Sequence, residues 1–382
     1  MGFHEFSSPY DWSRIAAYKR TAKAAFGGMI DLSVGSPVDP VPDSVRKALA
    51  VAANDPNAYG YPATAGTADL RAAIAEWFSV ARNVDLQAIH ADVVPTVGSK
   101  EGVALMASLL HFGEDDVVVQ PKVSYPTYEI GTQLAGAQVL KVDDVADVAS
   151  WRNVPGVKAV WVNSPCNPTG EVYSAERMAG IVAAVREIGA VVLSDECYAL
   201  MQWRGATNSA DDDPLQSTPC ALRSDVCAGS AEGVLVLYSL SKQSNMAGYR
   251  TAFIAGDESL IASMSAYRKQ IGQIIPGPVQ AAMAAGLRDL ESVKVQHVRY
   301  RERLGVLVSA LRAYGYCTDM PDGALYVWVR AKSGDCWTDM EQLAKIGIIA
   351  SPGEFYGAPE CLRFSATASD EAIASAAERL AR

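Results

Sequence analysis

The chain has 382 residues, of which 49% are hydrophobic and 20% charged, and its formal net charge is −10. This length exceeds what one hydrophobic core holds and predicts two domains. The acidic balance, without a block of lysine and arginine, argues against a nucleic-acid partner. No apolar run reaches the ~18 residues that span a bilayer, and MGFHEFSSPYDWSRI does not resemble a signal peptide, so a cytoplasmic location without membrane contact is expected.

The cysteines and histidines predict neither a disulfide framework nor a metal site. The seven cysteines are scattered and odd in number, and no C-x-x-C occurs, so reduced thiols are expected. The four histidines lie far apart and show no ligand spacing such as H-E-x-x-H.

Predicted elements begin after an irregular, proline-rich arm, and residues 1–45 are expected to form this arm and part of a small domain. Further on, short β-branched runs alternate with helical stretches. Strands are predicted at 93–94, 116–119, 139–142, 157–162, 191–193, 234–238 and 251–255, and helices at 99–110, 128–134 and 174–188. This alternation predicts an α/β domain over residues 46–280, with a mostly parallel, doubly wound sheet.

The pattern changes at Pro278, from which one long helical stretch is predicted toward Tyr314. Strand-like runs at 324–329, 347–350 and 362–365 follow, and then a closing helix. These elements predict a smaller α+β domain over residues 281–382. The polar segment 207–232 is expected to be a surface insertion.

A lysine directly follows one predicted strand in YSLSKQSNMAGYR, residues 238–250. A lysine that forms Schiff bases needs an amine that is neutral near pH 7, which partial burial beside positive charge provides. The hydroxyls of Ser239 and Ser241 and the guanidinium of Arg250 could together hold a phosphate. Taken alone, this pattern favours a solvated lysine at a strand end over a catalytic one.

Two more polar strings follow predicted strands. In VLSDECY, residues 192–198, Asp195 leaves an apolar strand, and a buried carboxylate needs a cationic or hydrogen-bonding partner, such as a protonated ring nitrogen. The alternative is a cap of a turn or helix. In NSPCNPTG, residues 163–170, a plain turn explains the proline and glycine but not the whole string.

A fourth string, TVGSKE at residues 96–101, places a glycine between a strand and a helix. The backbone N–H groups of Ser99 and Lys100 at the helix start would form an anion site, assisted by the helix dipole. The spacing differs from that of a Walker A loop.

These four strings, in this order and spacing, resemble the fold-type I, class I and II aminotransferases, which use pyridoxal 5′-phosphate (PLP), and the resemblance covers nearly the whole chain. It implies that Lys242 holds PLP as an internal Schiff base and that Asp195 pairs with the pyridine nitrogen. With Tyr198, these are the implied catalytic residues. The further implied cofactor contacts are Asn167 and Tyr198 to the ring oxygen, Tyr125 stacked on the ring, and Ser99, Lys100, Ser239, Ser241 and Arg250 around the phosphate.

The resemblance also implies substrate and subunit contacts. Arg363, in CLRFSAT, matches the arginine that clamps the substrate α-carboxylate, a group that suits a bidentate guanidinium. Gly35, in LSVGSP, matches the glycine whose backbone lies beside that carboxylate, and Asn167 is also implied to contact substrate. Tyr61 matches a tyrosine that reaches the phosphate of the neighbouring subunit, so a homodimer with active sites at its interface is implied.

The implied reaction is amino transfer between amino acids and 2-oxo acids by a ping-pong cycle. Strings such as YGYPATAGTADLR and SLSKQSNMAGYRTAFIAGD are similar to bacterial succinyldiaminopimelate aminotransferases of lysine biosynthesis. L-glutamate would then be the donor and N-succinyl-2-amino-6-oxopimelate the acceptor. Arg268 and Lys269 are candidates for the extra carboxylates of that acceptor, or else solvated surface charges.

Two other activities of the same fold remain open at this stage. One is an aspartate or aromatic aminotransferase, and the other is a PLP-dependent carbon–sulfur β-lyase. A transcription regulator with this fold would need an added basic DNA-binding region, which the acidic charge and the short stretch before LSVGSP oppose.

Overall fold

A computed structural model describes residues 11–203 and 218–382, which form two compact units. The large unit comprises residues 36–301 with 321–324, and the small unit comprises residues up to 35, 302–320 and 325–382. These limits differ from the sequence-based division at residues 45 and 280, because helix α11 (Leu290–Ala313) contributes residues to both units.

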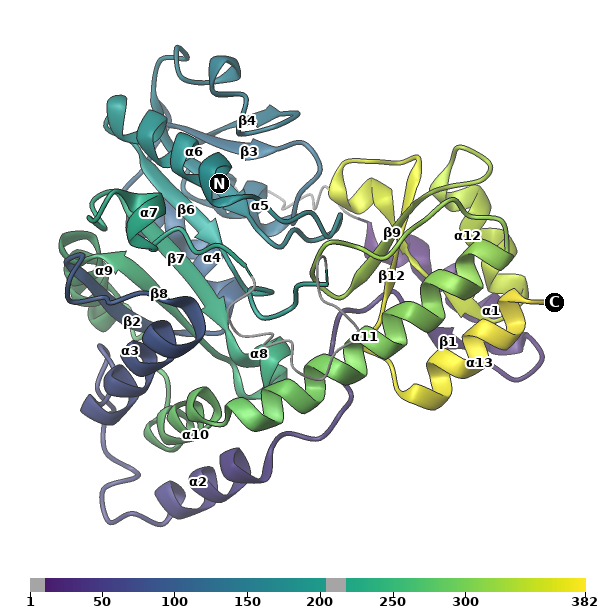
Figure 1. Cartoon of the computed structure of the whole chain (residues 1–382), viewed down its shortest axis with the longest axis horizontal. Helices are drawn as coiled ribbons and strands as arrows, with labels where there is room; N and C mark the ends of the chain where they lie inside the picture. Colours follow the sequence, from purple (N-terminus) through teal and green to yellow (C-terminus); the bar gives the residue numbers. More distant parts are fainter. Residues whose placement is uncertain (1–10, 204–217) are drawn as a thin grey trace, which may run out of the picture. The chain divides into compact units, whose positions relative to one another are not determined.

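The large unit is built around a seven-stranded sheet (Figure 1). Its strand order is β2-β8-β7-β6-β5-β3-β4, in which only β8 runs antiparallel to its neighbours. The strands are β2 (Ala91–Val97), β3 (Val117–Pro121), β4 (Gln138–Val142), β5 (Val157–Asn163), β6 (Val191–Asp195), β7 (Val234–Ser239) and β8 (Thr251–Asp257). They include every strand predicted in this region.

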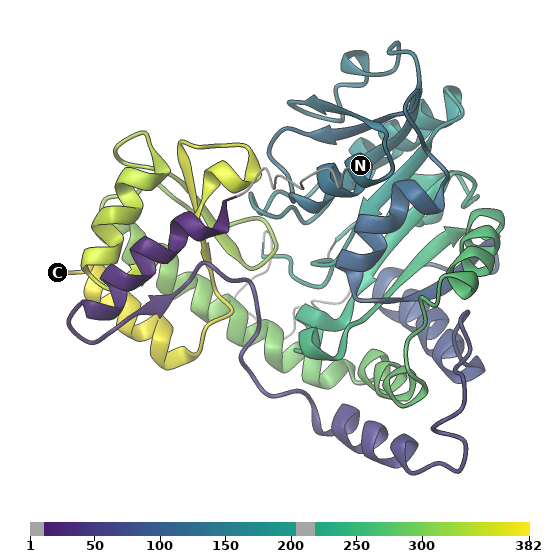
Figure 2. The same cartoon turned by 180° about the vertical axis from the view of Figure 1, so that it is seen from behind.

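Helices cover both faces of this sheet, as the two opposite views show (Figures 1 and 2). In β7, Leu235 and Leu237 pack in one core cluster and Val236 and Tyr238 in the other, because successive side chains point to opposite faces. One cluster contains residues of α4 (Ser99–Leu109), α5 (Thr127–Leu134) and α9 (Glu258–Gln270). The other contains residues of α2 (Asp43–Ala53), α3 (Ala68–Arg82), α6 (Ala175–Glu187), α7 (Ser224–Cys227), α8 (Leu240–Gln243) and α10 (Gly277–Arg288). The predicted doubly wound α/β architecture is therefore confirmed.

The single long helix predicted from Pro278 is wrong, because α10 ends at Arg288 and α11 begins at Leu290. Asp289 separates the two helices with φ −86° and ψ 66°, which are not helical angles. Its carboxylate accepts hydrogen bonds from the backbone N–H of Ser292, at 3.1 Å, and from the hydroxyl of Ser44. An aspartate that bonds to a backbone N–H three residues ahead is a typical start of a new helix.

The predicted surface insertion is also wrong for its second half. Residues 207–217 lie outside the described residues, but Thr218, Cys220 and Leu222 are buried and join the large unit. Polar composition misled the prediction, since the apolar side chains of this segment contribute to the core.

The small unit contains an antiparallel sheet in the order β11-β12-β9 and a parallel pair β1-β10. Its elements are α1 (Ile15–Ala24), β1 (Ile30–Asp31), β9 (Tyr326–Arg330), α12 (Cys336–Lys345), β10 (Ile348–Ile349), β11 (Ser351–Pro352), β12 (Cys361–Ser365) and α13 (Asp370–Leu380). The prediction of an irregular amino-terminal arm is thus wrong for α1 and β1. The α+β character of the carboxyl-terminal region is confirmed.

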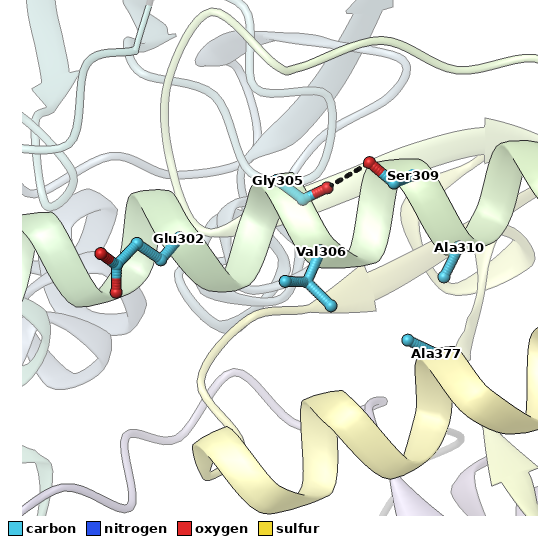
Figure 3. Close-up of a pocket in the computed structure, with 6 residues that line it drawn as sticks. All are labelled: Glu302, Gly305, Val306, Ser309, Ala310 and Ala377. Atoms are coloured by element: carbon cyan, nitrogen blue, oxygen red, sulfur yellow. Dashed lines mark hydrogen bonds between the residues drawn. The ribbon is translucent and has the colours of Figure 1, made fainter. Parts of the chain in front are cut away.

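A shallow surface pocket of about 670 Å³ lies between α11 and α13 of the small unit (Figure 3). Its lining includes Glu302, Val306 and Ala377, and the Ser309 hydroxyl donates to Gly305 O over 2.9 Å. None of the residues implied in catalysis lines it. No helix within residues 11–203 and 218–382 is long and apolar enough to cross a membrane.

Candidate functional site

The carboxyl ends of β5 and β6 bring together two of the polar strings. Asn163 and Asp195 are partners in the parallel register, and Asn163 Nδ2 donates to Asp195 O over 2.9 Å. Asn163 Oδ1 accepts a hydrogen bond from the backbone N–H of Asn167 at 2.8 Å, which ties the turn containing Asn167 to the strand end. Ligand sites of parallel α/β sheets form at this edge.

The Asp195 carboxylate is buried and hydrogen-bonded at both oxygens. Oδ2 accepts from the Tyr128 hydroxyl at 2.8 Å and Oδ1 from the backbone N–H of Cys197 at 3.1 Å. Burial raises the pKa of Asp195 above its ordinary value, while these hydrogen bonds pull the pKa in the opposite direction. A carboxylate in this environment is stabilised by a cation placed next to it.

Tyr128, which the sequence analysis did not select, is held in place by aromatic packing on α5. Its ring stacks on Trp161 of β5 with centroids 4.4 Å apart and 15° between the planes. The ring of Tyr125 meets it edge-on at 5.7 Å and 81°. The sequence signal available was its place three residues after Tyr125, in the same string SYPTY.

Lys242 lies on α8, one turn after β7, and is half-buried. The buried thiol of Cys197, which follows β6, interacts electrostatically with both Lys242 and Asp195. Burial raises the pKa of Cys197, the Asp195 carboxylate adds to this rise, and hydrogen bonding with Ser99 and the charge of Lys242 oppose it. Lys242, Asp195 and Ser99 therefore all influence the pKa of one thiol.

Several residues that the resemblance assigns to a phosphate lie at the start of α4 and after β7. Ser239 Oγ donates to Ser241 Oγ over 2.7 Å and lies 3.1 Å from Thr251 O. Arg250 Nη2 lies 3.5 Å from Val97 O, beside the α4 N-terminus. Gly98 has φ 79°, and a Cβ at this position would overlap the Arg250 guanidinium, so this cradle requires glycine.

Beside Asp195 lies a buried ion pair that the sequence analysis also missed. Glu196 Oε2 and Arg82 Nη2 are 2.8 Å apart, and both side chains are 1% exposed. Glu196 Oε1 accepts from Ser194 Oγ at 3.0 Å and from the backbone N–H of Ala221 at 2.8 Å. Arg82 also donates to Thr218 Oγ1 over 2.6 Å. The pair therefore fastens residues 218–221 to the strand that carries Asp195.

The remaining predicted residues have different surroundings. Tyr198 is buried just after β6, whereas Lys100 is exposed on α4 and Tyr61 is fully exposed between α2 and α3. Arg363 and Gly35 belong to the small unit. The suggestion that Arg268 lines a substrate entrance or is a surface charge is wrong, because its side chain is fully buried and bonds to Glu101 Oε1 at 2.8 Å.

The family model for aminotransferase class I and II matches residues 27–380, and the chain belongs to this family. It is 40% identical to a 4-dedimethylamino-4-oxo-anhydrotetracycline transaminase of Streptomyces rimosus, over 97% of this chain and 98% of that protein. It is 39% identical to a probable aminotransferase of Mycobacterium tuberculosis, over 97% and 84% of the two chains. Among solved structures, a probable N-succinyldiaminopimelate aminotransferase from Thermus thermophilus is similar, with a TM-score of 0.81, 27% identity, and coverage of 97% and 99%.

The protein is therefore a PLP-dependent aminotransferase, which confirms the predicted fold, enzyme class and cofactor. The strand-end residues fit that cofactor. A buried carboxylate with a raised pKa suits a pyridinium nitrogen, and the Gly98–Arg250 cradle with the helix start beside it suits a phosphate.

Proposed function

We propose that this aminotransferase moves an amino group between L-glutamate and N-succinyl-2-amino-6-oxopimelate, a step of diaminopimelate and lysine biosynthesis. The choice of glutamate as donor is supported by Arg363, whose buried guanidinium suits an α-carboxylate. The acceptor half is supported by the sequence strings that resemble succinyldiaminopimelate aminotransferases and by the 27% identical Thermus structure.

Within the large unit we assign four roles. Lys242 anchors the cofactor and then moves the proton at the substrate Cα. Asp195 keeps the cofactor ring protonated at nitrogen, and Asn167 and Tyr198 bond to its ring oxygen. The ring thereby serves as the electron sink for cleavage of the Cα–H bond.

The other contacts follow from the positions of their residues. We assign the phosphate to the Gly98 cradle, with Ser99, Lys100, Ser239, Ser241 and Arg250 as its ligands and Lys100 acting through its backbone. Tyr125 stacks on the cofactor ring. Gly35, Asn167 and Arg363 contact the substrate. The fully exposed Tyr61 ring supports a role at a second subunit, so we propose a homodimer.

A second acceptor class is favoured by the 40% identical relative, whose name gives 4-dedimethylamino-4-oxo-anhydrotetracycline as its substrate. An acceptor of that kind carries its oxo group on a ring and not beside a carboxylate. The two proposals therefore differ in whether acceptor binding requires Arg363.

The deciding experiment offers glutamate with a panel of acceptors and measures release of 2-oxoglutarate. We expect N-succinyl-2-amino-6-oxopimelate to give the highest kcat/KM, above oxaloacetate, aromatic oxo acids, pyruvate and the 4-oxo-anhydrotetracycline. A preference for any of the others would contradict the proposed acceptor. Release of pyruvate and ammonia from cystathionine without an acceptor would indicate the β-lyase instead.

The proposed homodimer is tested separately by sedimentation of the holoenzyme at micromolar concentration. A dimer whose activity falls on Tyr61→Ala substitution is expected. A fully active monomer would contradict it.

A further inference from the structure

Two tyrosine rings surround the guanidinium of Arg363 inside the small unit. Arg363 Cζ lies 3.9 Å from the ring centroid of Tyr326 and 4.8 Å from that of Tyr356. All three side chains are buried, with 5%, 2% and 6% of their surfaces exposed. Aromatic faces stabilise a desolvated guanidinium through their quadrupole, so these rings offset part of the cost of burying this cation.

The strand register produces this arrangement. Arg363 of β12 is directly opposite Trp328 of β9, and Tyr326 lies two residues before Trp328. A residue displaced by two positions on the neighbouring strand shares the same face and is within reach of a long side chain. Tyr326 and Arg363 therefore meet because of the pairing of β9 with β12.

Tyr356 reaches the guanidinium from a different segment, just after β11. Its hydroxyl lies 3.2 Å from Ser351 Oγ, and its ring meets the Trp328 ring edge-on, with centroids 6.0 Å apart and 89° between the planes. Tyr356 is thus held by contacts that do not involve Tyr326.

A guanidinium offers its faces to aromatic rings and its N–H groups outward in its own plane. One of these groups is already used, since Nη2 donates to Ser33 O over 2.8 Å. Face contacts with tyrosine hold the group without using its in-plane hydrogen-bond directions, which are those that a carboxylate needs.

Tyr326 also leaves no room for a side chain at position 35. A Cβ on Gly35 would overlap the Tyr326 hydroxyl, so the phenol oxygen lies directly beside the backbone of this glycine. Tyr326 consequently contacts both small-unit residues to which the α-carboxylate is assigned.

We propose that Tyr326 and Tyr356 are positioning residues that orient Arg363 for the substrate α-carboxylate, an inference that rests on the proposed role of Arg363. Their rings act through the guanidinium and the Tyr326 hydroxyl acts through Gly35. Loss of a ring should weaken binding of every substrate that carries an α-carboxylate and leave the rate of the bound complex nearly unchanged.

The test uses the holoenzyme and the half-reaction with glutamate, measured as the change in cofactor absorbance. Tyr326→Leu and Tyr356→Leu should each raise the KM for glutamate about tenfold, because loss of a desolvated cation–π contact weakens binding by about that factor. The kcat of each variant should stay within about threefold of the wild-type value. Tyr356→Phe, which keeps the ring, should restore the wild-type KM. Tyr314→Leu is the matched control, because Tyr314 packs on Lys332 at 3.7 Å in the same unit, and it should leave KM unchanged.

Two further measurements separate the possible failures. The slow half-reaction with 4-aminobutanoate, which is glutamate without its α-carboxylate, should be unaffected by either leucine substitution. In an Arg363→Met background, Tyr356→Leu, which acts through the guanidinium alone, should add no further loss for glutamate. Equal losses for both amines, or additive losses in that background, would overturn the positioning role. A wild-type KM in Arg363→Met itself would instead refute the proposed function of Arg363.

Discussion

The Tyr128 hydroxyl donates to the Asp195 carboxylate over 2.8 Å inside the large unit. This bond joins the helix that follows β3 to the end of β6, and it lies where the burial of a carboxylate is most costly. A cation bound beside Asp195 would offset this cost. The apoprotein is therefore less stable because of the buried carboxylate.

Removal of the Asp195 charge should stabilise the apoprotein. Burial raises the folded-state pKa of Asp195 above its value in the unfolded chain, so its contribution to stability is present below the unfolded pKa and is lost as pH rises through the folded pKa. Asp195→Asn should therefore raise the Tm of the apoprotein at neutral pH by a few degrees and have little effect near pH ~3.9, the ordinary aspartate pKa. The exposed Asp55→Asn should leave Tm unchanged. Destabilisation by Asp195→Asn at neutral pH would disprove this.

Loss of the Tyr128 hydroxyl should shift the acid limb of activity. The hydrogen bond favours the charged carboxylate, so Tyr128→Phe raises the pKa of Asp195 and moves the acid limb of kcat/KM to higher pH. A reduction of about tenfold or more at neutral pH is expected, since a hydrogen bond to a charged group contributes ~1.5–3 kcal/mol. Tyr316→Phe is the control, because its hydroxyl donates to Asp339 at the same distance of 2.8 Å in the small unit. An unchanged pH profile in Tyr128→Phe would count against the role given to this bond.

Replacement of the lysine on α8 should abolish turnover. Lys242→Ala removes the only group proposed both to anchor the cofactor and to move the Cα proton. We expect the absorbance of the lysine–cofactor linkage to disappear and kcat to fall by at least about 10³, in line with the loss of a principal acid–base group. Lys158→Ala, at an exposed position of β5, should retain both. A spectrum identical to that of the wild type would eliminate Lys242 from this role.

Space beside Arg250 should control the affinity for the cofactor. Gly98→Ala places a methyl group against the Arg250 guanidinium and strains a residue with φ 79°. We expect the dissociation constant of PLP, measured by fluorescence titration, to rise about tenfold or more, as for the loss of a charge-assisted phosphate contact. Gly180→Ala is the matched control, because nothing lies within 4 Å of its added Cβ. Equal PLP affinity in both variants would show that the cradle is not used.

The buried pair beside Asp195 should matter for stability much more than an exposed pair. Glu196→Gln leaves the Arg82 charge buried without its carboxylate and should cost about 3–5 kcal/mol in denaturant unfolding. Glu187→Gln removes the exposed partner of Arg152 and should cost less than about 1 kcal/mol. Similar losses in the two variants would mean that burial does not determine the strength of the Arg82 pair.

The sequence was sufficient for the features that depend on local pattern. Runs such as 159–162 and 234–238 are apolar on both faces, which is the pattern of a central strand covered by helices on both sides. The strings that contain Asp195, Asn167 and Lys242 follow these strands directly, so the topology alone places them near the carboxyl edge. The identity of the cofactor was then predicted from the resemblance to the aminotransferase family.

Features that depend on distant partners could not be predicted in this way. Arg268 is charged and flanked by polar residues, and its burial depends on distant partners, Glu101 Oε1 at 2.8 Å and Pro95 O at 3.4 Å. The roles of Tyr128 and Arg82 likewise depend on bonds to Asp195 and Glu196, which lie more than sixty positions away in the sequence. Helix α1 was missed because the whole arm was judged by its proline-rich end, SPVDPVPDS, whereas α1 itself contains no proline.

The register of the central sheet also has a consequence for the accuracy of folding. Asn163 pairs with Asp195, and Asp195 with Leu237, because three apolar strands align without offset at this edge. A slip of β6 by one residue would turn Asp195 to the opposite face of the sheet and bury it among the side chains packed under α3 and α6. A misaligned chain would thus lose the carboxylate proposed to hold the cofactor ring and part of its core at the same time.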